Sequence, residues 1–209
     1  MVTGWRRGIG AAVAAIVEAT DHEVVRFVGD VADEIDWAMT PPVDALVNCA
    51  GIGFTNPLGH ESLEQFDRVM AVNFRGPVLG MRHVLPRMVE AKRGHIVNIT
   101  SIYAEDAGVG LSFSYHTSKA ALSMATRNAA RRYARHGIRI NEVRPGFTDT
   151  EMSKAYWTSQ GYREYVNGGT PLQRMAHPEE IAKVVMFLLS DESSYMTGAS
   201  VAVDGGWLA

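Results

Sequence analysis

The sequence predicts an α/β fold in three layers, with a doubly wound parallel sheet between two layers of helices. Strand-like stretches alternate with helical ones along the chain, and this alternation is typical of parallel strands joined by crossover helices. Glycine-rich or polar stretches follow the strands directly, at the edge where an open parallel sheet receives a nucleotide. The length of 209 residues suits a single domain, 1–209, with a sizeable core.

The composition excludes several classes of protein. Hydrophobic residues make up 46% and charged residues 21%, as in ordinary soluble globular proteins. A net charge of −3 gives no basic field to attract nucleic acid, and the basic cluster at 127–139 falls at a helix end, where cations complement the dipole. The single cysteine, Cys49, excludes an intramolecular disulfide and a cysteine-based metal cluster. We therefore expect a cytoplasmic protein with no metal, no nucleic acid and no membrane partner, since neither a signal peptide nor an apolar run of ~20 residues is present.

The start of the chain has the pattern of a nucleotide-binding turn. Residues 1–3 read as a short strand, and the alanine-rich stretch 11–19 should be helical. Between them lie Gly4, Gly8 and Gly10, spaced Gly-x-x-x-Gly-x-Gly. In a strand–turn–helix unit such glycines let the backbone approach a pyrophosphate, which the free N–H groups of the helix N-terminus bind. Taken alone, this spacing also fits an ordinary tight turn.

Two more strands are predicted in the first half of the chain. Residues 23–28 read as a strand that ends at Gly29-Asp30-Val31. Residues 45–48 read as a buried strand, and the small residues 49–53 follow it directly. Small residues at the carboxyl end of a strand leave room for a ligand.

A long helix should follow these strands. Ser62 and Gln65 have the spacing of a capping box, and apolar residues then recur at helical intervals. Asn73 falls within this helix, where it is either a tolerated polar residue or a side chain turned toward a site. Pro86 should kink or break the later part of the helix.

The second half repeats the alternation of strand and helix. The predicted strands are 95–100, 138–143 and 201–203, and the predicted helices are 115–136 and one that starts near Pro178. Ser101 and Pro145-Gly146 stand at the carboxyl ends of two of these strands. The stretch 147–171 lacks a clear period and is rich in aromatic residues, namely Phe147, Tyr156, Trp157, Tyr162 and Tyr165. We interpret it as an irregular substrate lid.

Tyr115 and Lys119 carry the strongest chemical signal. They are four residues apart, which places both side chains on one face of the predicted helix. A tyrosine normally titrates near pH ~10, but an adjacent cation favours the phenolate. A tyrosine tuned in this way can exchange a proton with an alcohol oxygen. The pair alone could equally be a core tyrosine and a surface lysine.

In combination, the motifs of this chain resemble those of the classical short-chain dehydrogenase/reductase family over nearly the whole length. The matching residues are Thr3-Gly4-x-x-x-Gly8-Ile9-Gly10, Asp30-Val31, Asn48-Cys49-Ala50-Gly51, Asn73, Ser101, Tyr115-x-x-x-Lys119, Pro145-Gly146-x-x-x-Thr150 and the ending Met196-Thr197-Gly198 to Asp204-Gly205-Gly206. The resemblance implies a Rossmann-like sheet, an NAD or NADP cofactor, and hydride transfer between a secondary alcohol and a ketone.

The resemblance also implies a role for each matching residue. Tyr115 would be the general acid/base, Lys119 would lower its pKa and hold the nicotinamide ribose, Ser101 would donate to the carbonyl oxygen, and Asn73 would anchor a relay water. The cofactor would be bound by Gly4, Arg7, Gly8, Ile9, Gly10, Asp30, Val31, Asn48, Ala50, Gly51, Tyr115, Lys119, Pro145, Gly146 and Thr150.

The N-terminal half departs from the family pattern. Between Gly10 and Asp30 the family has strand, helix and strand, whereas this chain has room for only one strand after its helix. The shortening removes the residue that usually distinguishes NAD from NADP. Arg7 could pair with a 2′-phosphate, so we expect NADP over NAD; the alternative is a solvated turn arginine.

Three expectations concern function and assembly. The first is an oxidoreductase for an apolar, cyclic carbonyl compound, and the alternative is a non-catalytic nucleotide sensor or scaffold on the same fold. The second is a homotetramer, with a homodimer as the other option, because Tyr133, Trp207 and Leu208 have no obvious internal use. The third is that the stretch 147–171 closes over the substrate.

Overall fold

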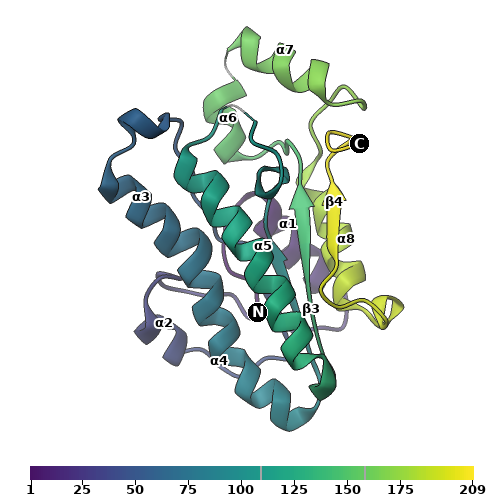
Figure 1. Ribbon diagram of the computed structural model, residues 1–209. Helices are drawn as coiled ribbons and strands as arrows, with labels where there is room; N and C mark the ends of the chain where they lie inside the picture. Colours follow the sequence, from purple (N-terminus) through teal and green to yellow (C-terminus); the bar gives the residue numbers. More distant parts are fainter. Residues whose placement is uncertain (109, 158) are drawn as a thin grey trace.

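The computed structural model describes residues 1–108, 110–157 and 159–209, without the side chains of 155–157. In this part of the chain, parallel strands form a sheet in the order β1-β2-β3-β4 (Figure 1). Their bounds are Ala45–Asn48, Gly94–Ile99, Ile138–Pro145 and Ser200–Val203. All four lie within a residue or two of the predicted strands, and the parallel α/β fold is confirmed.

Helices cover both faces of this sheet. In chain order they are α1 (Gly8–Glu18), α2 (Glu34–Ala38), α3 (Leu63–Met70), α4 (Gly76–Ala91), α5 (Phe113–Tyr133), α6 (Glu151–Trp157), α7 (Gln160–Gly169) and α8 (Pro178–Leu189). Figure 1 shows α4 and α5 on one side of the sheet and α1 and α8 on the other. None of the described helices is long and apolar enough to span a membrane.

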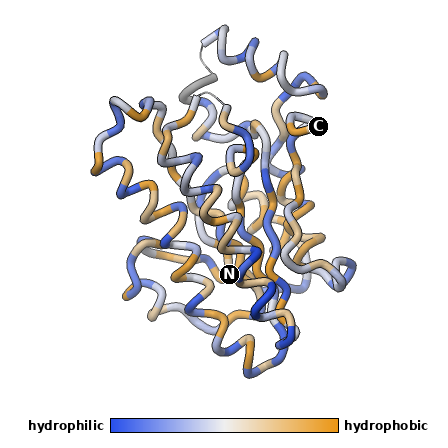
Figure 2. The backbone as a smooth tube through the Cα atoms, viewed as in Figure 1, coloured by the Kyte–Doolittle hydropathy of each residue, from blue (hydrophilic) through white to orange (hydrophobic). Residues whose placement is uncertain are grey.

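Each face of the sheet has its own hydrophobic core. Leu46, Ile96 and Ile140 pack with residues of α4 and α5 on one face, and Val47, Val97 and Val143 pack with residues of α1 and α8 on the other. Strands buried on both faces are apolar at consecutive positions, which is why 45–48 could be recognised from the sequence. Figure 2 shows the hydrophobic residues gathered along the strands and the inner sides of the helices.

The N-terminal edge of the sheet is reduced to single bridges. Val2 bridges Val47 on one side and Arg26 on the other, and the Val2 N–H donates to the Val25 carbonyl at 2.9 Å. The predicted strand 23–28 is therefore wrong as a full strand, since only one bridge forms there. This segment lies directly beside residue 2, and α2 follows it.

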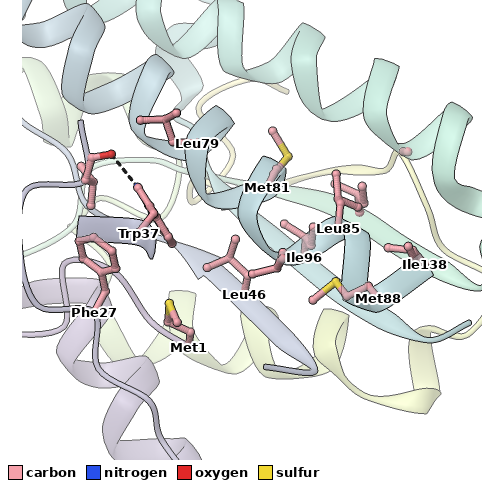
Figure 3. Close-up of a cluster of buried hydrophobic side chains, with 14 of the residues drawn as sticks. Met1, Phe27, Trp37, Leu46, Leu79, Met81, Leu85, Met88, Ile96 and Ile138 are labelled. Atoms are coloured by element: carbon pink, nitrogen blue, oxygen red, sulfur yellow. Dashed lines mark hydrogen bonds between the residues drawn. The ribbon is translucent and has the colours of Figure 1, made fainter. Parts of the chain in front are cut away.

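Trp37 fixes the segment that follows this edge. Its side chain is 1% exposed, and its indole N–H donates to the Val31 carbonyl at 2.8 Å. The rings of Trp37 and Phe27 lie 4.3 Å apart, and Figure 3 shows both at one end of the core cluster. A Cβ on Gly80 would approach the Trp37 ring to 2.6 Å, so α4 packs closely against this indole.

The long helix around Asn73 differs from the expectation in two ways. Residues Ala71–Arg75 form a π-helical turn between α3 and α4. The helix continues through Pro86, which lies inside α4, so the alternative of a break there is wrong; the neighbouring Leu85 and Met88 are buried. The predicted capping box of Ser62 and Gln65 is present.

The stretch 147–171 is largely helical, so the prediction of irregular structure is wrong. Ser159 caps α7 by accepting from the Tyr162 N–H at 3.2 Å. Tyr162, Tyr165 and Val166 have helical spacing, and Val166 is fully buried. The side chains of Tyr156 and Trp157, which the sequence also assigned to this surface, lie outside the part of the chain that is described.

Candidate active site

A cavity of about 1010 Å³ opens at the carboxyl ends of the strands. The turn before α1, the ends of β1 to β3, the start of α5 and the residues after β3 all contribute to its wall. The predicted site residues that line it are Gly4, Arg7, Gly8, Ile9, Gly10, Asp30, Val31, Ala50, Gly51, Ser101, Tyr115, Lys119, Pro145, Gly146 and Thr150. Asn48 and Asn73 do not line it.

The glycine turn forms a close-fitting cradle. Gly4 and Gly8 have φ angles of +65° and +56°, which side-chain-bearing residues rarely adopt. A Cβ on Gly10 would lie 2.3 Å from the Gly4 carbonyl oxygen, so no larger residue fits there. Arg7, the N-cap residue of α1, makes no side-chain capping bond. The cradle therefore fits a pyrophosphate bound to backbone N–H groups.

Lys119 is a buried cation at the centre of the cavity wall. Its side chain is 4% exposed, and Nζ donates to the Ile99 carbonyl at 2.8 Å. Burial lowers the pKa of this ammonium to about 8. Nζ lies 5.6 Å from the centre of the Tyr115 ring, which is 8% exposed. The helix thus brings phenol and ammonium together as the spacing predicted, and Lys119 is not a surface residue.

Asn73 supports the site from behind. Its Oδ1 accepts from the Ile52 N–H at 2.9 Å, and its Nδ2 donates to the Ile52 carbonyl at 2.8 Å and to Ser118 Oγ at 3.2 Å. A Cβ on Gly51 would lie 3.5 Å from Asn73 Oδ1 and 3.6 Å from Lys119 Nζ. The π-helical turn therefore lets Asn73 tie the loop after β1 to α5, one residue before Lys119; such turns often mark functional sites.

Ser101 and Asn48 differ in how they relate to the cavity. Ser101 stands at the carboxyl end of β2, lines the cavity, and its Oγ accepts from the Tyr103 N–H at 3.2 Å. Asn48 was expected to bind the cofactor, but its Nδ2 donates inward to Asn98 Oδ1 at 2.8 Å. Asn98 in turn donates to Thr126 Oγ1 at 2.8 Å. Asn48 therefore belongs to a buried chain that joins β1, β2 and α5.

Thr3 begins the first of the matching motifs but was given no role in the sequence analysis, yet it shapes the end of β1. Its Oγ1 accepts from the N–H groups of Cys49 and Ala50 at 2.9 and 3.0 Å. A threonine before a glycine turn gives no periodic signal of such a contact.

Polar groups surround the end of the cavity near the glycine turn. Arg68 donates to Asp30 at 2.7 Å, and the pKa of Asp30 is lowered by its hydrogen bond from the Ala32 N–H and by Arg68. Arg6 and Arg7 are exposed on the cavity wall. Sequence reasoning missed Arg6 and Arg68, and Arg68 could not be found because 38 residues separate it from Asp30.

The other end of the cavity is aromatic. Tyr103, Phe147 and Tyr162 line it, and burial is the main cause that raises the pKa of Tyr103. Trp207 packs 4.9 Å from Phe147 and donates to Asp106 at 2.7 Å. The expectation that Trp207 and Leu208 have no internal use is therefore wrong, since both pack on this cluster. It is also wrong for Tyr133, which is partly buried against the core that includes Leu46 and Ile96. Across the described residues, no group of three or more His, Cys, Asp or Glu is arranged to bind a metal.

The chain is similar to known dehydrogenases in sequence and structure. Residues 6–208 match the family model described as Enoyl-(Acyl carrier protein) reductase. The mouse (3R)-3-hydroxyacyl-CoA dehydrogenase is 40% identical over 83% of this chain, which spans 66% of that relative's length. The cyclopentanol dehydrogenase of Comamonas testosteroni is 37% identical over 86% of this chain and 75% of the relative.

The solved structures show the same likeness. A gluconate 5-dehydrogenase from Burkholderia cenocepacia, in complex with NADP and tartrate, superimposes with a TM-score of 0.92. It is 27% identical, and the match covers 99% of this chain and 93% of that structure. Together with the cavity geometry, these matches show that the chain belongs to the short-chain dehydrogenase/reductase family.

Proposed function

We propose that this chain is an NAD(P)-dependent oxidoreductase that interconverts a secondary alcohol and a ketone, with Tyr115 as general acid/base. The observation that carries the proposal is the buried Tyr115–Lys119 pair on the wall of the same cavity as the glycine cradle. The relatives named above are dehydrogenases, and none supports the alternative of a non-catalytic sensor.

Lys119 prepares Tyr115 for proton transfer. An ammonium beside a phenol stabilises the phenolate, so Tyr115 can take the proton of an alcohol or return it to a ketone oxygen. The pKa of about 8 leaves most Lys119 side chains charged at neutral pH. Ser101 would donate to the substrate oxygen, on which charge develops during reduction. Asn73 would hold the loop at Ile52 in place and anchor a relay water.

The cavity residues fit a nicotinamide dinucleotide. Gly4, Gly8, Ile9 and Gly10 would line its pyrophosphate, Asp30 and Val31 would flank adenine, and Ala50, Gly51, Lys119, Pro145, Gly146 and Thr150 would hold the riboses and the amide. Asn48 would act only through the strand that it supports. When bound, the cofactor supplies the hydride acceptor or donor, and the protein supplies geometry and the proton.

The charges near the glycine turn favour NADP over NAD. Asp30 pairs with Arg68, whereas Arg6 and Arg7 form no ion pair with the described residues and face the cavity. An unpaired guanidinium is well suited to a 2′-phosphate.

The aromatic wall favours an apolar, cyclic alcohol or ketone. Tyr103, Phe147 and Tyr162 offer ring faces and edges to a substrate beside Tyr115. The relative named as a cyclopentanol dehydrogenase supports this class. The helices α6 and α7 belong to the stretch 147–171, which would form a lid over the bound substrate. The single free cysteine, Cys49, supports a reducing, cytoplasmic location.

A homotetramer, or else a homodimer, is the assembly that we propose. A groove of about 900 Å³ between α4 and α5 is lined by Val78, Leu85, Val89, Met124 and Tyr133, among others. Met124 is 58% exposed there, and a second copy of the same face would cover it.

Replacing Tyr115 by Phe should lower kcat for cyclopentanol oxidation by ~10²-fold or more, because the ring remains and the transferable proton is lost. Binding of NADPH, followed by its fluorescence, should barely change. Tyr195→Phe is the matched control, since Tyr195 is fully exposed. Near-full activity of Tyr115→Phe would show that the assignment of the base is wrong.

Replacing Arg7 by Ala should weaken NADPH binding roughly 10-fold and NADH binding much less, since only NADPH carries the 2′-phosphate. Arg87→Ala, on the exposed side of α4, should leave both affinities unchanged. An equal loss for the two cofactors would contradict the NADP preference.

Hydrogen exchange tests the lid. Amides of 147–171 should become more protected when NADP⁺ and cyclopentanol are both present, because a closing element gains contacts. Strong protection that is equal in the free and ternary forms would mean that α6 and α7 are a fixed wall.

Light scattering at micromolar concentration tests the assembly. The expected mass is four times that of the 22.8 kDa chain, or twice that mass for a dimer. Met124→Glu should reduce the mass by placing a charge in the groove, whereas Leu63→Glu, at a position 80% exposed on α3, should not. A monomeric wild-type protein would contradict the proposal.

A further inference from the structure

Glu142 is a carboxylate enclosed between the sheet and α5. It lies on β3 with 0% exposure. Its Oε1 accepts from Ser123 Oγ at 2.8 Å, from Arg144 Nε at 2.9 Å and from Ser200 Oγ. Its Oε2 has no hydrogen-bond partner among the described residues. Burying a carboxylate oxygen without a hydrogen-bond partner destabilises the folded state, so packing alone does not account for a glutamate at this position.

The position of Glu142 relates it to Lys119. Ser123, which binds Glu142, lies four residues after Lys119 on α5, and both are buried on the face toward the sheet. Lys119 Nζ binds the carbonyl of Ile99, which is paired in the sheet with Val143, the neighbour of Glu142. Carboxylate and ammonium therefore share the same narrow layer between α5 and the strands.

The ion pairs around Glu142 indicate that Lys119 helps to balance the negative charge of this carboxylate. Arg144 forms ion pairs with both Glu142 and Glu105, so one cation faces two anions. Glu105 is 63% exposed at its side chain, and water screens it, whereas Glu142 is fully enclosed. Glu142 therefore shares its ion-pair partner with a second carboxylate, and Lys119, which forms no ion pair with the described residues, is a further buried cation in the same layer.

Cys49 and Tyr115 also lie near Lys119. Burial raises the pKa of the Cys49 thiol to about 12, so Cys49 is uncharged at neutral pH. Burial lowers the pKa of Lys119 to about 8, and Cys49 and, next in size, Glu142 act in the opposite direction. Because Cys49 carries no charge at neutral pH, Glu142 is the anion that offsets the cost of burying the ammonium.

We propose that Glu142 is a positioning residue for the reaction, and that its buried charge keeps Lys119 protonated so that Lys119 can act on Tyr115. The catalytic consequence rests on the proposed function, but the effect on Lys119 does not. No contact between Glu142 and the substrate or cofactor is involved.

The direct test follows the protonation of Lys119 by NMR of lysine labelled with ¹³C at Cε. The chain has four lysines, and Lys92, Lys154 and Lys183 are exposed, so Lys119 should titrate separately near the pKa of about 8. Its signal is identified by its loss in Lys119→Met. In Glu142→Gln its midpoint should fall by ~1 pH unit or more, because removing an anion disfavours the ammonium.

Glu105→Gln is the matched control, since it removes the same charge from the exposed end of the network and should leave the midpoint near its wild-type value. If Glu142→Gln does not fold, Glu142→Met removes the same charge together with the unpartnered oxygen. An unchanged Lys119 midpoint in whichever Glu142 variant folds would overturn the proposal.

The pH profile of cyclopentanol oxidation with NADP⁺ is the second readout. In Glu142→Gln the alkaline limb of kcat/KM should move to lower pH, since Lys119 loses its proton earlier. A purely structural role would lower Tm and reduce activity at every pH without moving the limb, and that result would also overturn the proposal. Should the wild-type protein oxidise no alcohol at all, the proposed function fails, while the NMR titration still decides the role of Glu142.

Discussion

The burial of the Lys119 ammonium is the constraint on which the site depends. An enclosed cation is costly unless hydrogen bonds and charges compensate for it. The Ile99 carbonyl provides the bond, and the enclosed Glu142 provides the opposing charge. The carbonyl is available because Ile99 is the last residue of β2. Because Lys119 must reach the carbonyl at the end of β2, the position of α5 along the sheet is fixed. The same position brings Tyr115 to the carboxyl edge of the sheet.

Two polar side chains, those of Thr3 and Asn73, fix the loop after β1. Thr3 binds its first N–H groups, and Asn73 binds both backbone groups of Ile52. Asn73 lies in the π-helical turn and is buried there, and such turns often occur at functional sites. Its second bond, to Ser118, joins this loop to α5 beside Lys119. The glycine cradle and the Tyr115–Lys119 pair are therefore joined through short polar contacts.

The shortened N-terminal half is compensated by side chains. With only single bridges beside Val2, the edge of the sheet has few backbone bonds. Trp37 also fixes this edge: its ring packs on Phe27, its N–H donates to the Val31 carbonyl, and Gly80 lies close to its ring. Asp30 is then fixed by Arg68 of α3. The adenosine end of the cavity is thus built from tertiary contacts rather than from an additional strand.

The sequence by itself determined the layers, the strands β1 to β4 and the Tyr115–Lys119 pair, but not the segment 23–28. These depend on local pattern: both-face burial makes 45–47 continuously apolar, and a four-residue spacing puts two side chains on one helix face. The glycine spacing was also visible in the sequence, because the group that limits the space at Gly10, the Gly4 carbonyl, belongs to the same turn. Only the tertiary structure decided that Asn48 points inward, that Arg68 meets Asp30, that Trp207 packs on Phe147, and that Glu142 shares a layer with Lys119. These contacts join residues tens of positions apart, and a long-range contact leaves no period in the sequence from which it could be read.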